Sequence, residues 1–161
     1  MELACSPVVT FRDSLVFKSN LQKEYRVEWG SSLGEGASGQ IRRCVHMATG
    51  KTCALKVLPD NADSRHELLM WRACMPHPNI VNLLDVFKED LCLANDYLRR
   101  PWIVAIMDFM AGGDLYFEVV RRQRFKESDV QFVGTQLMQV LVLMKQSGLI
   151  SMLLSMPESL D

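Results

Sequence analysis

The sequence predicts an α+β fold, in which strand-like segments are followed by helices. Within residues 25–110, five segments show the alternation or the short apolar runs that are typical of β-strands. One helical segment interrupts these strands, and residues 111–148 contain two further helical segments. A glycine-rich stretch, LGEGASGQI at 33–41, lies between the first two strand-like segments. Together these observations favour a sheet that carries a glycine loop and is followed by a helical part.

The composition is that of a soluble globular protein. The 161 residues are 48% apolar and 23% charged, enough for one modest domain with a core. The formal net charge of −1 gives no bulk attraction to nucleic acid or to an anionic membrane, so neither is predicted as a partner. The 5 cysteines are odd in number and lack C-x-x-C spacing, which favours reduced thiols in a cytoplasmic or nuclear protein.

Two segments are relevant to secretion and to membrane insertion. The start, MELACSPVVTF, has an acid at position 2 and no basic region before an apolar run, unlike a secretory signal. The stretch 137–156 contains a single charge, Lys145, and its length suffices to span a bilayer. However, Lys-Gln-Ser-Gly interrupts its middle, and its first half continues an amphipathic pattern. A membrane span is therefore disfavoured.

The glycines at 34, 36 and 39 have G-x-G-x-x-G spacing. This spacing alone fits a dinucleotide loop, a phosphate-covering loop or an ordinary turn. A dinucleotide fingerprint needs a helix directly after its glycines. Residues 40–47 instead alternate like a strand and lead through ATGK, with Gly50 available for a positive φ, into 52–58. The sequence thus predicts a glycine loop between antiparallel strands.

The remaining elements follow in order. Residues 1–24 lack a period and predict a loosely ordered leader. RHELLMWRAC at 65–74 predicts a helix, and the proline-containing stretch 75–87 ends in an apolar run that predicts a strand. The polar stretch 88–101 predicts a loop, and WIVAIMDFM at 102–110 predicts a buried strand.

Two helices are expected after residue 110. AGGDLYFEVVRRQRF at 111–125 becomes helical after its glycines, and 127–148 is the longest helix candidate. Ser128 and Gln131 fit a capping box at the start of the longer helix. Its apolar side chains follow helical spacing at Val130, Val133, Leu137, Val140, Leu141 and Met144. Residues 140–144 are apolar on nearly every side, which predicts deep burial.

Residues 25–150 resemble the front half of a protein kinase catalytic domain of the serine/threonine, calmodulin-kinase group. LGEGASGQI, CALKV with Lys56, Glu67 on the next helix, HPNIV and IVAIMDFMAGGDLY occur in the order and at the spacing of that family. EYRVEWGSSLGEG and the long loop before the last strand resemble the p38-regulated branch of the MAP-kinase-activated protein kinases.

This resemblance implies a domain organisation. A kinase N-lobe, with a five-stranded antiparallel sheet and one prominent helix, would occupy 25–106. A hinge would follow at 107–114 and two helices of an incomplete C-lobe at 115–150, with 151–161 as a divergent tail.

The resemblance also implies ATP as the ligand. In the glycine loop and the strands that follow, it implies ATP-binding roles for Leu33, Gly34, Glu35, Gly36, Gly39, Ile41, Ala54 and Lys56. Lys56 would reach the α- and β-phosphates, and Glu67 would pair with Lys56 and hold it there. Met107 would lie at the back of the adenine pocket. The backbone of Asp108 and Met110 would hydrogen-bond adenine, and Asp114 would accept a bond from the ribose hydroxyls.

The motifs that carry kinase catalysis are missing from these residues. After the long helix the sequence reads QSGLISMLLSMPESLD, with no H-R-D, no D-F-G and no paired Asn. We therefore expect no catalytic base and no Mg²⁺ ligands, and no catalysis by this chain alone. Asp108-Phe109 begins like D-F-G, but it precedes the long helix and is predicted to be a decoy.

Three interpretations remain open from the sequence. The chain is the truncated ATP-binding portion of an active kinase, or a non-catalytic nucleotide- or partner-binding module that competes with the full-length kinase. In a third, the tail lies in or on a membrane. The resemblance implies an upstream MAP kinase as partner, and the apolar long helix implies a protein that covers it.

Overall fold

The computed structural model of the protein describes residues 15–36, 39–92 and 99–149, with only the backbone described for Ser31, Glu35 and Gly36. The described residues form two compact units. One unit comprises 15–73 and 81–113 and contains the sheet; the other contains 74–80 and the helices after residue 113. The predicted leader residues 1–14 and tail residues 151–161 lie outside the described residues.

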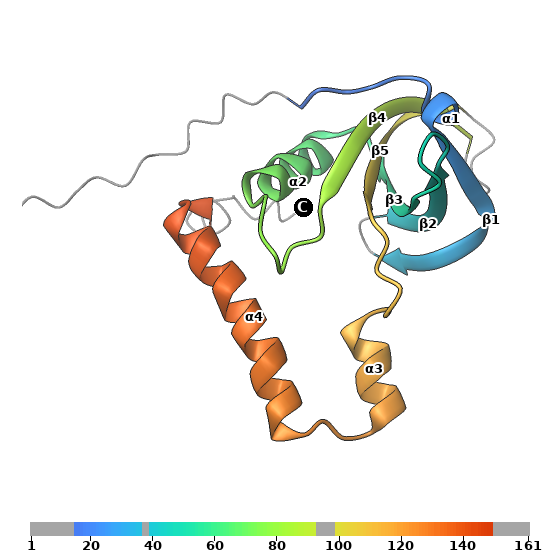
Figure 1. Ribbon diagram of the computed structural model, residues 1–161. Helices are drawn as coiled ribbons and strands as arrows, with labels where there is room; N and C mark the ends of the chain where they lie inside the picture. The colour runs from blue at the N-terminus through green and yellow to red at the C-terminus, as the bar shows by residue number, and fades with distance from the viewer. Residues whose placement is uncertain (1–14, 37–38, 93–98, 150–161) are drawn as a thin grey trace, which may run out of the picture. The chain divides into compact units, whose positions relative to one another are not determined.

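The first unit is built on a five-stranded sheet with strand order β1-β2-β3-β5-β4 (Figure 1). All neighbouring strands are antiparallel, which confirms the predicted α+β fold with an antiparallel sheet. The strands are β1 (Tyr25–Gly36), β2 (Gly39–His46), β3 (Thr52–Pro59), β4 (Leu83–Leu91) and β5 (Arg100–Asp108). Gly50 has φ 70° in the turn between β2 and β3, as its position in ATGK predicted.

One face of the sheet carries the main hydrophobic core. Alternate residues of β3, Cys53, Leu55 and Val57, are at most 2% exposed and pack in one cluster. The other buried members of this cluster are Leu21, Tyr25, Cys44, Phe87, Val104 and Ile106. Because side chains alternate along a strand, the residues between these core positions point to the opposite face. Ala54 and Lys56 therefore share the second face of the sheet.

Helix α2 (Ala62–Ala73) follows β3 directly. The Asn61 side-chain oxygen accepts a hydrogen bond from the Ser64 backbone N–H at 2.9 Å, which satisfies one donor of the first turn. Leu68 is completely buried. At the other end, the indole N–H of Trp71 donates to the Val81 carbonyl at 2.7 Å. Trp71 thus ties the end of the helix to the segment that enters β4.

The expectation of a loosely ordered leader is corrected for residues 15–24. The backbone of Lys18 pairs with β4 on both sides of Phe87, donating to the Val86 carbonyl and accepting from the Lys88 N–H. A short helix α1 (Leu21–Glu24) follows, and Leu21 is 2% exposed. The structure of residues 15–24 depends on a few contacts with the distant strand β4. Such contacts leave no periodicity in the sequence of the leader.

The expected loop at 88–101 is also corrected at both ends. Strand β4 continues to Leu91 and β5 begins at Arg100, with Lys88 opposite Ile103 and Leu91 opposite Arg100. Residues 88–91 alternate between exposed and half-buried, so a polar segment can extend the ladder on a solvated surface. Residues 93–98 lie outside the described part of the chain.

The second unit contains α3 (Leu115–Arg122) and α4 (Glu127–Gln146), as the helical spacing predicted (Figure 1). The predicted capping box of Ser128 and Gln131 is wrong. The helix begins earlier, and the Asp129 carboxylate accepts from the Lys126 backbone N–H at 3.3 Å. The side-chain amide of Asn79 donates to the Gln136 carbonyl at 3.3 Å, which anchors the loop 74–80 to α4.

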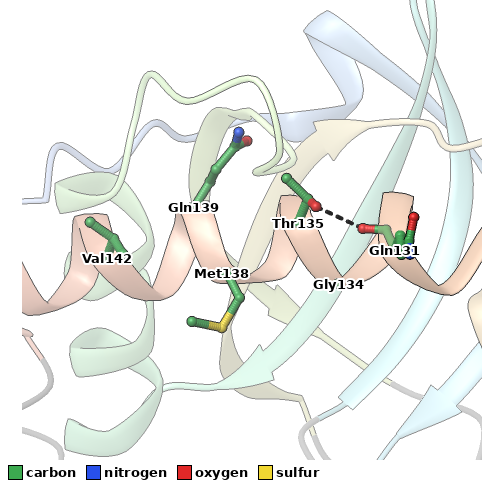
Figure 2. Close-up of a pocket in the computed structure, with 6 residues that line it drawn as sticks. All are labelled: Gln131, Gly134, Thr135, Met138, Gln139 and Val142. Atoms are coloured by element: carbon green, nitrogen blue, oxygen red, sulfur yellow. Dashed lines mark hydrogen bonds between the residues drawn. The ribbon is translucent and has the colours of Figure 1, made fainter. Parts of the chain in front are cut away.

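The predicted deep burial of α4 is also wrong, because none of its residues is buried within the described structure. Several of its apolar side chains are exposed, including Leu137 and Met138 at 58% each. Figure 2 shows a hollow along one face of this helix, lined by Gln131, Gly134, Thr135, Met138, Gln139 and Val142. All six lining residues belong to α4, so the hollow is one side of a single helix.

Among the described residues, no helix is both long enough and apolar enough to cross a bilayer.

Candidate nucleotide-binding site

An ion pair joins the sheet to α2. Lys56 Nζ on β3 lies 2.5 Å from Glu67 Oε1 on α2. The Lys56 side chain is 14% exposed and the Glu67 side chain 38%. β3 is paired on both sides, so the lysine leaves a rigid strand, and the glutamate stands near the middle of a capped helix. The pair therefore holds the ammonium group of Lys56 at a defined place on the second face of the sheet.

The residues around Lys56 come from three neighbouring strands. Lys56 lies opposite Ile41 on β2 and Ala105 on β5, and Ala54 lies opposite Met107. Directly paired residues of antiparallel strands share a face. The sheet thus brings together four of the predicted site residues, Ile41, Ala54, Lys56 and Met107, on the face opposite the main core.

The glycine loop is the hairpin between β1 and β2. Gly34 pairs with Ile41 and Gly36 with Gly39, whereas Ala37 and Ser38 lie outside the described residues. For Glu35 and Gly36 the described structure gives only their backbone in β1. Leu33, on the same strand, is 46% exposed.

The glycines of this loop differ in what surrounds them. Gly39 has φ 140°, and a Cβ there would meet the Val57 carbonyl oxygen at 2.1 Å. A Cβ at Gly34 would meet nothing within 4 Å. Gly39 is therefore required by the protein's own backbone, whereas the space above Gly34 is open to a ligand.

Residues 108–110 follow the end of β5, where the hinge was predicted. The Asp108 carboxylate accepts from Lys51 Nζ at 2.6 Å and from Asn82 Nδ2 at 2.8 Å. These hydrogen bonds, the one from Lys51 first, lower the pKa of Asp108 below its ordinary value. Both carboxylate oxygens of Asp108 thus accept hydrogen bonds from the protein. Met110 is 53% exposed.

Asp114 belongs to the helical unit, unlike the other predicted site residues. Its carboxylate accepts from the Phe117 backbone N–H at 2.9 Å and caps α3. A contact with ribose stays a prediction for this residue.

Three side chains near the hinge were not anticipated from the sequence: Lys51, Asn82 and Arg43. Lys51 and Asp108 are 57 residues apart, and no local pattern connects them. The register that pairs Cys53 with Asp108 brings them together. Only a correct strand order would have revealed this contact.

Within the described part of the chain, no group of three or more His, Cys, Asp or Glu side chains is arranged to hold a metal ion.

Comparison with known proteins identifies the class to which this fold and site belong. Residues 27–152 match the protein kinase domain, and the chain therefore belongs to the protein kinase family. Its relatives are serine/threonine kinases of the calmodulin-kinase group, and the match covers the N-terminal part of the catalytic domain.

Among individual relatives, MAP kinase-activated protein kinase 5 of Homo sapiens is 30% identical over 125 residues, covering 78% of this chain and 26% of the relative. The protein of the same name from Mus musculus has the same identity and coverage. Calcium/calmodulin-dependent protein kinase type II of Caenorhabditis elegans is 30% identical over 124 residues, covering 73% of this chain and 16% of the relative. The chain thus spans about a quarter of the length of the first two relatives.

Proposed function

We propose that this chain is an ATP-binding portion of a protein serine/threonine kinase of the MAP-kinase-activated type. The observation that carries the proposal is the 2.5 Å pair of Lys56 and Glu67. A lysine on the third strand that is paired with a helix glutamate is what the kinase family uses to hold the α- and β-phosphates of ATP. The proposal therefore gives Lys56 contact with phosphate and gives Glu67 the positioning of that lysine.

The glycine loop supports the same ligand. The open space at Gly34 leaves room for phosphate oxygens close to the backbone, where successive N–H groups can donate to an anion. Under this proposal Gly34, Glu35, Gly36 and Gly39 form the cover over the triphosphate. A side chain at Gly34 would fill the space that the phosphates need.

The adenine would lie on the apolar part of the same face. Ala54 is 5% exposed and small, so a flat ring can approach β3 there. Ile41 and Leu33 would cover the ring, and Met107 would close the back of the pocket. The backbone of Asp108 and Met110 would supply the hydrogen bonds, because a hinge strand offers one carbonyl and one N–H on the same edge.

We further propose that these 161 residues do not transfer phosphate by themselves. ATP chemistry in this family uses Mg²⁺ and a catalytic-loop aspartate, and the sequence holds neither an H-R-D nor a D-F-G motif. The residues present fit the nucleotide but not the metal. Transfer of the ATP γ-phosphate to protein Ser or Thr is thus assigned to the family and not to this chain alone.

A non-catalytic role as a nucleotide- or partner-binding module is the second candidate. One observation favours it: Lys56, Glu67 and nearly all the proposed nucleotide contacts belong to one compact unit of the structure, comprising 15–73 and 81–113. Such a unit can hold a ligand without the catalytic machinery. An upstream MAP kinase, a protein that covers α4 and a cytoplasmic or nuclear location belong to the proposal for either role.

A thermal-shift titration of the 161-residue chain with ATP, with and without Mg²⁺, tests the proposal. We expect the melting temperature to rise with ATP in the wild type and to rise far less in Lys56→Met. Lys88→Met is the matched control, since Lys88 forms a 2.7 Å ion pair with Asp60 in the same unit. A cooperative melt that ignores ATP, or an equal response in Lys56→Met, would refute nucleotide binding at this site.

A further inference from the structure

The side chain of Asp108 is held from two sides. Lys51, which precedes β3, donates to one carboxylate oxygen at 2.6 Å, and Asn82, which precedes β4, donates to the other at 2.8 Å. The Asp108 backbone N–H also donates to the Asn82 carbonyl at 3.2 Å. Asp108 and Asn82 are thus joined through both backbone and side chain. These hydrogen bonds hold the last residue of β5 in place.

The next residue has an anchor of its own. The Arg43 guanidinium on β2 lies 5.6 Å from the centre of the Phe109 ring, within the range of a cation–π contact. The residue after Phe109 is also held: the Gly113 N–H donates to the Met110 carbonyl at 3.3 Å in a turn in which Gly113 has φ 74°. Consecutive residues of this segment are therefore held by separate contacts.

These anchors differ from an ordinary surface ion pair. The Lys51 side chain is 55% exposed and Asp108 19%, and a pair of this exposure alone adds little to stability. The ion pair acts instead on the orientation of the backbone at the end of β5. Three residues, here called the hinge clamp, contact Asp108 and Phe109: Lys51 just before β3, Asn82 just before β4, and Arg43 on β2. The clamp thus determines where the backbone of these residues points.

We propose that the hinge clamp positions the backbone of Asp108–Met110 for adenine and so sets the preference for adenine over guanine. This inference rests on the proposed function. The edge of adenine offers an amino donor beside a ring-nitrogen acceptor, whereas guanine offers a carbonyl at the first of these places. A hinge backbone held in one position can hydrogen-bond the edge of adenine. The same backbone leaves polar groups unpaired when guanine is bound. In this proposal Lys51, Asn82 and Arg43 are positioning residues, since they act through their contacts with Asp108 and Phe109.

The test uses Lys51→Ala and Asn82→Ala in the full 161-residue chain, with Lys51→Arg as the conservative variant. Lys88→Ala is the control, because it removes a comparable ion pair from the same unit. Dissociation constants are measured for ATP, GTP and inorganic tripolyphosphate. Amide hydrogen exchange is followed at residues 108–113 without ligand.

We expect Lys51→Ala and Asn82→Ala to weaken ATP binding by about 3- to 10-fold, the net range of one hydrogen bond, and to leave tripolyphosphate unchanged. The ATP-to-GTP ratio falls and exchange at 108–113 rises, whereas Lys51→Arg and Lys88→Ala match the wild type. A purely structural role would weaken ATP and tripolyphosphate equally. An unchanged ATP-to-GTP ratio, or unchanged exchange at the hinge, overturns the inference.

Failure of the proposed function gives a different result. In that case the wild type binds neither ATP nor tripolyphosphate, and Lys56→Met behaves like the wild type. The role of the clamp in adenine selection then falls with the proposed function. If the wild type binds ATP through Lys56 but the clamp variants keep its selectivity, only the inference about the clamp is wrong.

Discussion

A Cβ on Gly39 would lie 2.1 Å from the carbonyl oxygen of Val57, so the glycine loop and β3 approach each other backbone to backbone. Real Cβ atoms do not come this close to an oxygen, and the φ of 140° at Gly39 is itself strained for any other residue. The third glycine of the motif is therefore a requirement of the fold, whether or not a nucleotide binds.

Gly39→Ala is expected to lower the free energy of unfolding by about 2 kcal/mol or more, because either the backbone or β3 must shift. Gly34→Ala is the matched control, since its Cβ meets open space, and should change stability by at most about 0.5 kcal/mol. Urea denaturation measures both. If the two variants were equally stable, the close approach would have no energetic consequence.

Glu67→Gln is expected to weaken ATP binding by about 3- to 10-fold, because the neutral amide no longer orients the lysine charge. The unfolding free energy should fall by at most about 1 kcal/mol, since Glu67 is more than a third exposed. Isothermal titration calorimetry in a Lys56→Met background supplies the check. There, Glu67→Gln should have no further effect; a full effect in that background would contradict the pairing role.

Asp108 gives a pH-dependent prediction. Hydrogen bonds from Lys51 and Asn82 lower its pKa in the folded state, so its contribution to stability is present above the unfolded pKa of about 3.9. That contribution is lost as the pH falls through the lower folded pKa. The stability difference between wild type and Asp108→Asn should therefore be constant near neutral pH and vanish in acid. Denaturation at several pH values tests this, and a difference that grew in acid would reverse the assigned sign.

The cysteines give a prediction about reactivity. Burial raises the pKa of the Cys44 thiol to about 12, and Cys53 and Cys74 are also raised by burial, whereas Cys92 is exposed. In a Cys5→Ser background, we expect a thiol reagent to label Cys92 rapidly and the other three only on unfolding. Mass spectrometry of the labelled peptides identifies each site. Rapid labelling of Cys44 in the folded chain would show that its part of the core opens.

The order of strands and helices follows from local pattern. Segments such as 25–36 and 127–146 have their periodicity in consecutive residues, and Gly50 stands where a turn needs a positive φ. The resemblance to the family was carried by the glycine loop, Lys56, Glu67, HPNIV and IVAIMDFMAGGDLY together, in that order. Each of these signals is a property of a short stretch, or of stretches whose spacing the family shares.

Other features were decided by tertiary structure alone. The contacts of Lys51 with Asp108 and of Leu21 with Glu89 join residues 57 and 68 positions apart. Strands β4 and β5 are longer than predicted, because beyond the apolar core each strand supplies a pairing partner for the other's backbone. Such contacts depend on strand order and register, which are set by burial summed over the whole sheet. By itself, the sequence determined the order of strands and helices and the residues that we propose to bind phosphate. Only the tertiary structure decided which distant side chains meet, because a hydrogen bond or an ion pair between remote residues leaves no period in either segment.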